Sequence, residues 1–132
     1  MAYLLDSDTL IYFFKGIGQV RSHVSEQRDS DINLCAPVLY ELLTGAYKSQ
    51  DPRSQFARLE AAKKRFEVLS FSAVCADRSA QARAHLERLG TPIGPIDSLI
   101  AGIALAHDMT LVTRNTREFE RVPGLKIENW FD

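Results

Sequence analysis

Cysteine and long apolar runs are both scarce in this sequence of 132 residues. The only cysteines, Cys35 and Cys75, lie far apart in apolar surroundings, so we interpret them as buried thiols and expect a reducing, cytoplasmic location. The longest apolar runs, such as Leu10–Phe14 and Leu99–Ala106, are much shorter than the roughly 20 residues of a membrane helix. The start, Met1–Asp6, lacks a basic leader followed by a cleavage site, so we expect neither a signal peptide nor membrane attachment.

An excess of charge of one sign is also lacking, because 16 lysines and arginines oppose 17 acidic residues for a net charge of −1. A nucleic-acid partner would therefore be held by local basic patches or by metal ions rather than by the whole surface. Apolar residues make up 45% and charged residues 25%, which is typical of a folded globular protein. The sequence contains no repeat, low-complexity segment or long linker, and we predict one domain over residues 1–132.

Short apolar segments alternate with amphipathic ones along the chain. We predict strands at Ala2–Asp6, Ile32–Ala36, Val68–Phe71, Thr110–Thr113 and Lys126–Glu128. We predict a first helix that is capped by Ser7 or Asp8, runs to Phe14 and is ended by Gly16, and further helical segments at Gln19–Arg28, Pro37–Tyr47, Gln55–Glu67, Cys75–Leu89, Ile96–His107 and Thr116–Phe119. The strands lack polar alternation, which favours a mainly parallel sheet between two helical layers, an α/β sandwich. In such a sheet the ligand crevice lies beyond the carboxyl ends of the strands.

Three carboxylates lie at strand ends or near helix starts, where they are expected to face the crevice. Asp6 ends the first predicted strand, Glu41 lies among apolar residues of its helix, and Asp97 opens a helix after a loop rich in proline. Each has an ordinary alternative interpretation: Asp6 and Asp97 as helix caps, and Glu41 as a solvated side chain near a helix start. Because an unpaired buried carboxylate is costly, a cation or a proton is expected wherever such a group is buried.

A fourth polar group follows the predicted strand Thr110–Thr113. Thr113 ends that strand, and Asn115 and Glu118 follow in a turn, although an ordinary strand-to-helix turn has the same composition. Four such positions at strand ends and helix starts offer oxygen ligands, which suit Mg²⁺ or Mn²⁺. The histidines lie on separate predicted helices without ligand spacing, and we interpret them as surface or core-edge residues: His23, His85 and His107.

Five segments in this order and spacing form a specific pattern that covers the whole chain: Leu4–Ile11, Glu41–Gly45, Gly90–Ala101, Leu111–Phe119 and Pro123–Trp130. The pattern resembles PIN-domain ribonucleases of the VapC toxin type. That resemblance implies a PIN-like three-layer sandwich with four to five short strands. It also implies a Mg²⁺- or Mn²⁺-dependent endoribonuclease that acts as the toxin of a toxin–antitoxin pair and is usually dimeric.

The resemblance also assigns roles by position. It implies that Asp6, Glu41 and Asp97 hold the metal, and that Asn115 or Glu118 fills the fourth acidic place, with Thr113 and Asn115 orienting water or phosphate. Most members carry asparagine where this chain has Asp8. Similarity to relatives that cut initiator tRNA in its anticodon loop suggests a tRNA substrate. The antitoxin is expected to insert an apolar segment between helices and a basic side chain into the acidic pocket.

Two other functions have motifs that this sequence matches only in part. The segment Leu5–Leu10 resembles the nucleophile motif of haloacid-dehalogenase-type phosphatases, but Thr9 stands where that motif needs glycine and no later lysine precedes paired acids. A receiver-like signalling domain needs an aspartate at the end of a middle strand, where this chain has Phe71 and Ser72. These departures favour the nuclease, with a non-catalytic RNA- or protein-binding module with an acidic pocket as the alternative.

Two sets of residues carry the expectations about partners. RNA is expected to meet a basic rim, which could equally be a solvated charged face, formed by Arg114, Arg117, Arg121, Lys126, Lys48 and Arg53. A homodimer is expected from a set of mostly aromatic residues that exceeds what a small core easily hides: Tyr12, Phe13, Phe14, Tyr40, Leu43 and Tyr47. The alternative is that all of them belong to the core.

Overall fold

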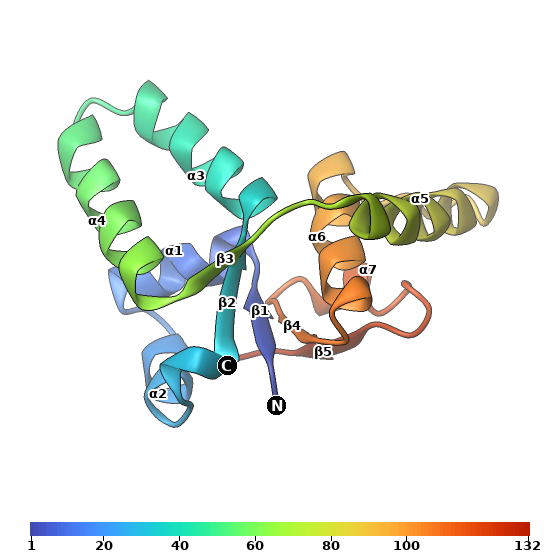
Figure 1. The fold of residues 1–132 in the computed structure, drawn as a ribbon, viewed down its shortest axis with the longest axis horizontal. Helices are drawn as coiled ribbons and strands as arrows, with labels where there is room; N and C mark the ends of the chain where they lie inside the picture. The colour runs from blue at the N-terminus through green and yellow to red at the C-terminus, as the bar shows by residue number, and fades with distance from the viewer.

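A computed structural model describes all 132 residues, and its centre is a sheet of five parallel strands. The strands are β1 (Tyr3–Leu5), β2 (Ile32–Cys35), β3 (Glu67–Leu69), β4 (Thr110–Val112) and β5 (Lys126–Glu128). Their order in the sheet is β3-β2-β1-β4-β5, so the most apolar strand, β1, lies at the centre (Figure 1). This arrangement confirms the predicted α/β fold.

Helices cover the sheet between successive strands. They are α1 (Ser7–Lys15), α2 (Val20–Ser25), α3 (Ala36–Lys48), α4 (Pro52–Arg65), α5 (Ala73–Arg88), α6 (Pro95–Ala106) and α7 (Thr116–Phe119), with a 3-10 turn at Asp29–Asp31. In Figure 1, α3 and α4 form a projecting hairpin on one side of the molecule, and α5 and α6 lie together on the other. None of these helices combines the length and apolar character that a membrane span requires.

The start of α1 differs from the prediction. Asp6, rather than Ser7 or Asp8, is the N-cap: its backbone is extended, and its carboxylate accepts a hydrogen bond of 2.9 Å from the backbone N–H of Thr9. The prediction was wrong because β1 already ends at Leu5, which leaves Asp6 as the last extended residue before the helix. The end of α1 is as predicted, since Gly16 adopts the left-handed conformation with φ 68°.

Two other helices have one end that lies three residues from the prediction, and the remaining helix ends differ from it by at most two residues. Helix α4 begins at Pro52, before the predicted Gln55, because proline is suited to the first turn of a helix, where no intrahelical N–H donor is needed. Helix α2 is limited to Val20–Ser25, shorter than the predicted Gln19–Arg28, and the chain continues into the 3-10 turn before β2. These differences leave the order of the elements unchanged.

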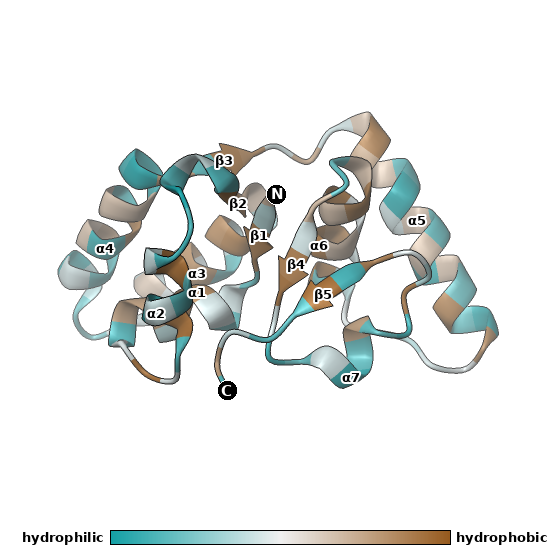
Figure 2. Ribbon diagram, turned by 90° about the horizontal axis from the view of Figure 1, so that it is seen from below, coloured by the Kyte–Doolittle hydropathy of each residue, from teal (hydrophilic) through white to brown (hydrophobic).

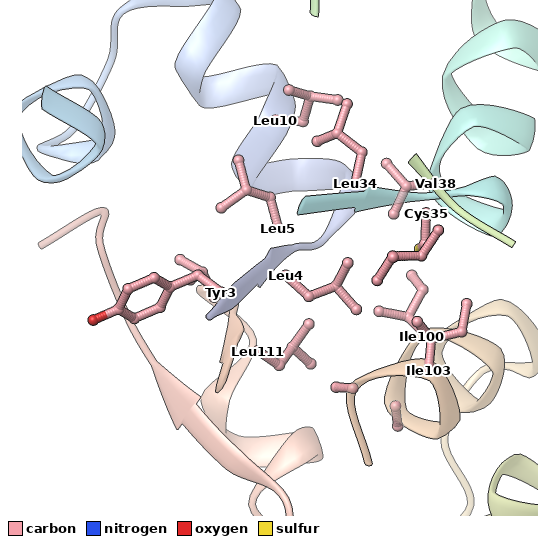
Figure 3. Packing of buried hydrophobic residues seen from close by; sticks show 14 of the residues in the cluster. Tyr3, Leu4, Leu5, Leu10, Leu34, Cys35, Val38, Ile100, Ile103 and Leu111 are labelled. Carbon is pink, nitrogen blue, oxygen red and sulfur yellow. The ribbon is translucent and has the colours of Figure 1, made fainter. Parts of the chain in front are cut away.

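The core lies on both faces of β1. Leu4 and Leu5 are fully buried, and Figure 3 shows Leu4 between Leu111 and the α6 residues Ile100 and Ile103. The inner strands β1 and β4 carry mainly hydrophobic colours in Figure 2, whereas the edge strand β5 is partly hydrophilic and hydrophilic colours prevail on α4. Complete burial of the central strand fixes where its carboxyl end points, and therefore where Asp6 stands.

The two cysteines are buried and unpaired, as predicted. Burial raises the pKa of the Cys35 thiol to about 12, so it stays protonated at neutral pH. Cys75 lies on α5, where that helix comes very close to α6. A Cβ atom on Gly102 would overlap the side chain of Ser79 and lie 2.8 Å from the carbonyl oxygen of Cys75. This close approach fixes α6, whose first turn carries Asp97.

Candidate active site

The site begins where β1 and β4 end side by side. Leu5 pairs with Val112, and the backbone N–H of Asp6 donates to the carbonyl oxygen of Val112 over 3.2 Å. The chain leaves β1 toward β2 on one side and enters the sheet through β4 on the other, so this edge is the switch point of the sheet. Asp6 and Thr113 are therefore neighbours although they are far apart in the sequence.

Asp6 is held rigidly at this edge. It is buried, with 6% of its surface exposed, and it accepts the hydrogen bond from the Thr9 backbone. Burial raises the pKa of the Asp6 carboxyl, while hydrogen bonds from the Thr113 side chain and the Thr9 backbone partly offset that rise. Thr113 is itself fully buried. The geometry thus gives Asp6 both the cap role and a fixed place in the crevice.

Asp97 is the most perturbed of the accessible carboxylates. It lies half-buried in the first turn of α6. Burial, together with nearby negative charges, raises the pKa of Asp97 to about 6. The negative charges belong to Glu41, Asp6, Glu118 and Asp8. The predicted acidic residues therefore share one electrostatic environment, although they come from four separate parts of the chain.

Glu41 reaches this environment from α3. Helix α3 follows β2 directly at the carboxyl end of the sheet (Figure 1), and α3 contacts α6. Glu41 is half-buried, and the Ser7 hydroxyl donates a hydrogen bond to its Oε1 atom. From the sequence alone, Ser7 is expected only as a helix cap. Its position directly after Asp6 was the available signal, but no local pattern indicates a contact between residues 7 and 41.

The two candidates for the fourth position, Asn115 and Glu118, contact each other. The Asn115 side chain donates to Glu118 Oε2 over 3.0 Å, and its backbone N–H donates to Thr113 Oγ1 over 2.9 Å. Glu118 brings the negative charge, which contributes to the raised pKa of Asp97. Asn115 joins Glu118 to the buried end of β4. Asp8 is exposed on α1 and adds a further charge beside Asp6 and Asp97.

The acids surround a common region without closing on one point. No three His, Cys, Asp or Glu side chains lie close enough together to hold an ion between them. The histidines lie elsewhere, with His23 stacked on Trp130 at a centroid distance of 5.4 Å. Of the predicted basic rim, Lys126 pairs with Asp108 over 3.1 Å and is therefore engaged outside the site.

A hollow of about 360 Å³ adjoins the acids between α1, α3 and α4. Ser7, Asp8 and Glu41 line one end of it. A second hollow of about 260 Å³ continues toward Phe66, and Phe14 and Arg58 line both hollows. The largest hollow, about 570 Å³, lies against α5, and its only carboxylate is Asp77. Two of the acids, Asp8 and Glu41, therefore face the groove between α1, α3 and α4.

The family of this chain is identified by its similarity to known proteins. The PIN-domain family model matches residues 3–125. The chain belongs to the PIN-domain family. It is 38% identical over 133 aligned residues to the tRNA(fMet)-specific endonuclease VapC of Salmonella typhimurium, with 98% of each chain covered. It is 35% identical to ribonuclease VapC2 of Rickettsia felis, again with 98% of each chain covered.

Solved structures of the family have the same fold. VapBC from Salmonella typhimurium, solved with bound DNA, superposes with a TM-score of 0.92 at 37% identity and 98% coverage of both chains. VapBC2 from Rickettsia felis, bound to a promoter DNA fragment, has the same TM-score at 34% identity, covering 98% of this chain and 99% of that one. The prediction of a VapC-type PIN-domain ribonuclease is confirmed, and the family assignment favours it over the phosphatase and signalling alternatives.

Proposed function

We propose that this VapC-type endoribonuclease cleaves RNA with a divalent metal ion held by Asp6, Asp97 and Glu41. The observation that carries the proposal is the pKa of Asp97, which burial and four neighbouring carboxylates raise to about 6. Such a concentration of like charge is destabilising without a counter-charge, and it is typical of functional sites. A bound divalent cation would supply that counter-charge and would attract an RNA phosphate to the acids.

The residues fit Mg²⁺ or Mn²⁺ by their chemistry. All donors are oxygens, which hard cations prefer. Mg²⁺ keeps several waters and is often bound through only one or two carboxylates, so it does not require three acids around one point. Asp6 and Asp97 would hold the ion, with Glu41 bound directly or through water. When bound, the ion supplies positive charge at the scissile phosphate and lowers the pKa of water at the site.

The protein's own residues position the reactants. Thr9 and Thr113 fix the Asp6 carboxylate, Ser7 fixes Glu41, and Asn115 fixes Glu118. In the proposed hydrolysis, a water oxygen attacks phosphorus in line, the bond from phosphorus to the 3′ oxygen breaks, and a proton passes to that leaving oxygen. The products carry a 5′-phosphate and a 3′-hydroxyl, because the 2′-hydroxyl takes no part.

The proposed substrate is initiator tRNA, cut in its anticodon loop. Support comes from two relatives named tRNA(fMet)-specific endonuclease, at 38% identity in Salmonella typhimurium and 37% in Shigella flexneri. The proposed inhibitor is a VapB-type antitoxin, because solved relatives are VapBC complexes. Its apolar segment would occupy the groove between α1, α3 and α4, which leads to the acids.

The experiment that tests this function is expression of the chain alone in bacterial cells, followed by mapping of new RNA 5′ ends across the transcriptome. The control is the Asp6→Asn variant, since asparagine also caps helices and preserves the start of α1. We expect new 5′-phosphate ends confined to the initiator tRNA anticodon loop in the wild type and none in the variant. New ends in other RNAs would overturn the tRNA assignment, and no new ends would overturn the nuclease assignment.

Glu118 is expected to provide the fourth carboxylate. Glu118→Gln should lower the cleavage rate by about 10–100-fold, the cost typical of losing a group that supports a metal site. Asn115→Ala should lower the cleavage rate less, because it only removes the hydrogen bond that holds the Glu118 side chain. The exposed neighbour Glu120 offers a matched control, since Glu120→Gln removes the same charge outside the site. The measurement is the initial rate of initiator tRNA cleavage. Full activity of Glu118→Gln together with a reduced rate for Asn115→Ala would assign the fourth position to Asn115.

A homodimer is proposed through the exposed face of α3. Tyr40 and Tyr47 are 61% and 76% exposed, whereas Tyr12, Phe13 and Phe14 pack partly against the core. The expected aromatic excess at the surface is thus limited to the two α3 tyrosines. We expect sedimentation velocity to give a dimer at micromolar concentration and a monomer for the Tyr40→Ser, Tyr47→Ser double variant. A monomeric wild type at that concentration would contradict the proposal.

A further inference from the structure

Arg114 is a charged residue beside the acids that no acid neutralises. It follows Thr113 directly, is exposed, and takes part in none of the ion pairs of the structure. Its guanidinium carbon instead lies 3.6 Å from the centre of the Phe131 ring and 5.8 Å from that of Tyr12. An arginine stacked on a ring by its flat face keeps the N–H groups along its edge available for another partner.

The ring beneath Arg114 is itself firmly held. Phe131 contacts Tyr12 edge-to-face, with ring centres 4.7 Å apart. Its carbonyl oxygen accepts a hydrogen bond of 2.8 Å from the backbone N–H of Gln19, and its own N–H donates to Asn129 Oδ1. Gly18 leaves room for the ring, because a Cβ atom there would lie 2.6 Å from a Phe131 ring carbon. Figure 2 shows the C-terminal segment running from β5 toward α1 and α2. The stacked cation is thus fixed before any ligand arrives.

We infer that Arg114, held over the ring of Phe131, binds a phosphate of the RNA strand next to the scissile one and thereby positions the strand across the acids. The inference rests on the proposed function. An acidic site repels the RNA backbone, so a nearby fixed cation assists the approach of the strand alongside the metal ion. The fork of a guanidinium matches two phosphate oxygens at once, and the stacked ring reduces the side-chain entropy lost on binding. Phe131 is a positioning residue because it acts through Arg114.

The first experiment measures steady-state cleavage of initiator tRNA by Arg114→Ala and Arg114→Lys. We expect Arg114→Ala to raise KM about tenfold, as for loss of one charge-assisted hydrogen-bonded contact, with kcat nearly unchanged. Arg114→Lys keeps the charge but loses the forked guanidinium, so its KM should lie between those of the wild type and Arg114→Ala. The matched control is Arg88→Ala, which removes an exposed arginine at the end of α5. A drop in kcat alone, or equal effects of Arg114→Ala and Arg88→Ala, would overturn the inference.

The second experiment measures binding of labelled initiator tRNA at several salt concentrations in the inactive Asp97→Asn background. Loss of one phosphate contact should reduce the slope of log affinity against log salt by about one. An unchanged slope with weaker binding would show that Arg114 does not contact phosphate. Because binding is measured without cleavage, the result is separable from the nuclease proposal. If the active enzyme leaves tRNA uncut while the salt effect persists, the proposed function fails and the phosphate contact stands.

The third experiment tests the ring. Phe131→Tyr keeps the ring face and should bind tRNA like the wild type, whereas Phe131→Leu keeps apolar bulk without the ring and should raise KM severalfold. In the Arg114→Ala background, Phe131→Leu should not raise KM any further, because Phe131 acts through that arginine. Melting temperatures identify any loss of folding. Additive effects of the two substitutions, or loss of binding in Phe131→Tyr, would overturn the positioning role.

Discussion

Replacing Asp97 by asparagine will reduce RNA cleavage by about three orders of magnitude, or about 4 kcal/mol of transition-state stabilisation, if Asp97 holds the metal ion. The fold should survive, because no hydrogen bond in the structure uses the Asp97 side chain and the N-cap of α6 is Gly94. Asparagine is nearly the same size and removes a charge that four other carboxylates oppose. The metal-free variant should therefore be more stable than the metal-free wild type.

The raised pKa of Asp97 determines how the stability of the folded protein depends on pH. The folded protein holds the Asp97 proton up to about pH 6, whereas the unfolded chain releases it near its ordinary value of 3.8. Below that ordinary value both states are protonated, and Asp97 costs no stability. Between about pH 4 and pH 6 the unfolded state gains its charge first, so stability falls as pH rises, and the full cost is present above pH 6. The unfolding free energies of wild type and Asp97→Asn should therefore be similar at low pH and should differ increasingly as the pH rises to about 6.

Thermal unfolding in chelator measures this difference. Because Asp97 is half-buried, solvent screens part of the repulsion, and we expect roughly 1 kcal/mol, or about 4 °C in melting temperature, at pH 7. Added Mg²⁺ should stabilise the wild type and not the variant, since it binds only the intact folded site. The exposed Asp51 provides the control, because Asp51→Asn removes the same charge away from the site. Full cleavage by purified Asp97→Asn would contradict the assignment.

The fold was predictable because its signals are local. The inner strands are short, mainly apolar runs, and Gly16 and Gly90 lie just beyond helix ends with positive φ. The acidic residues were also predictable, since each stands at a strand end or in the early part of a helix. The cap of α1 was assigned wrongly because Asp6, Ser7 and Asp8 all have capping side chains. Only the end of β1 decides among them.

The contacts that adjust the site were not predictable, because they join residues distant in sequence. Ser7 meets Glu41 only because α1 and α3 lie together at the sheet edge. Arg114 meets Phe131 only because the chain returns past β5 to α1. Neither contact leaves a periodic pattern, so each depends on tertiary structure. The sequence thus predicts the acids, and the structure adds the groups that orient them.

Inhibition by the antitoxin is expected to compete with the metal ion. The groove between α1, α3 and α4 has apolar walls at Phe14 and Leu59, and its acid end carries Asp8 and Glu41. An apolar segment of the antitoxin fits the walls, and an arginine at the end of that segment would reach the acids. A guanidinium binds two carboxylate oxygens together, which are the same atoms that a metal ion needs. Raising the Mg²⁺ concentration should therefore raise the amount of antitoxin required for half-inhibition.

Matched variants separate the two parts of this contact. Replacing the antitoxin arginine by alanine should abolish the Mg²⁺ dependence while leaving weaker binding in the groove. Phe14→Ala should raise the half-inhibitory concentration about tenfold, because Phe14 lines both hollows of the groove. Val74→Ala removes apolar surface from an exposed position on α5 and should leave the half-inhibitory concentration unchanged. Inhibition that is equal at all Mg²⁺ concentrations, and that survives loss of the arginine, would mean that the antitoxin blocks the RNA path without reaching the acids.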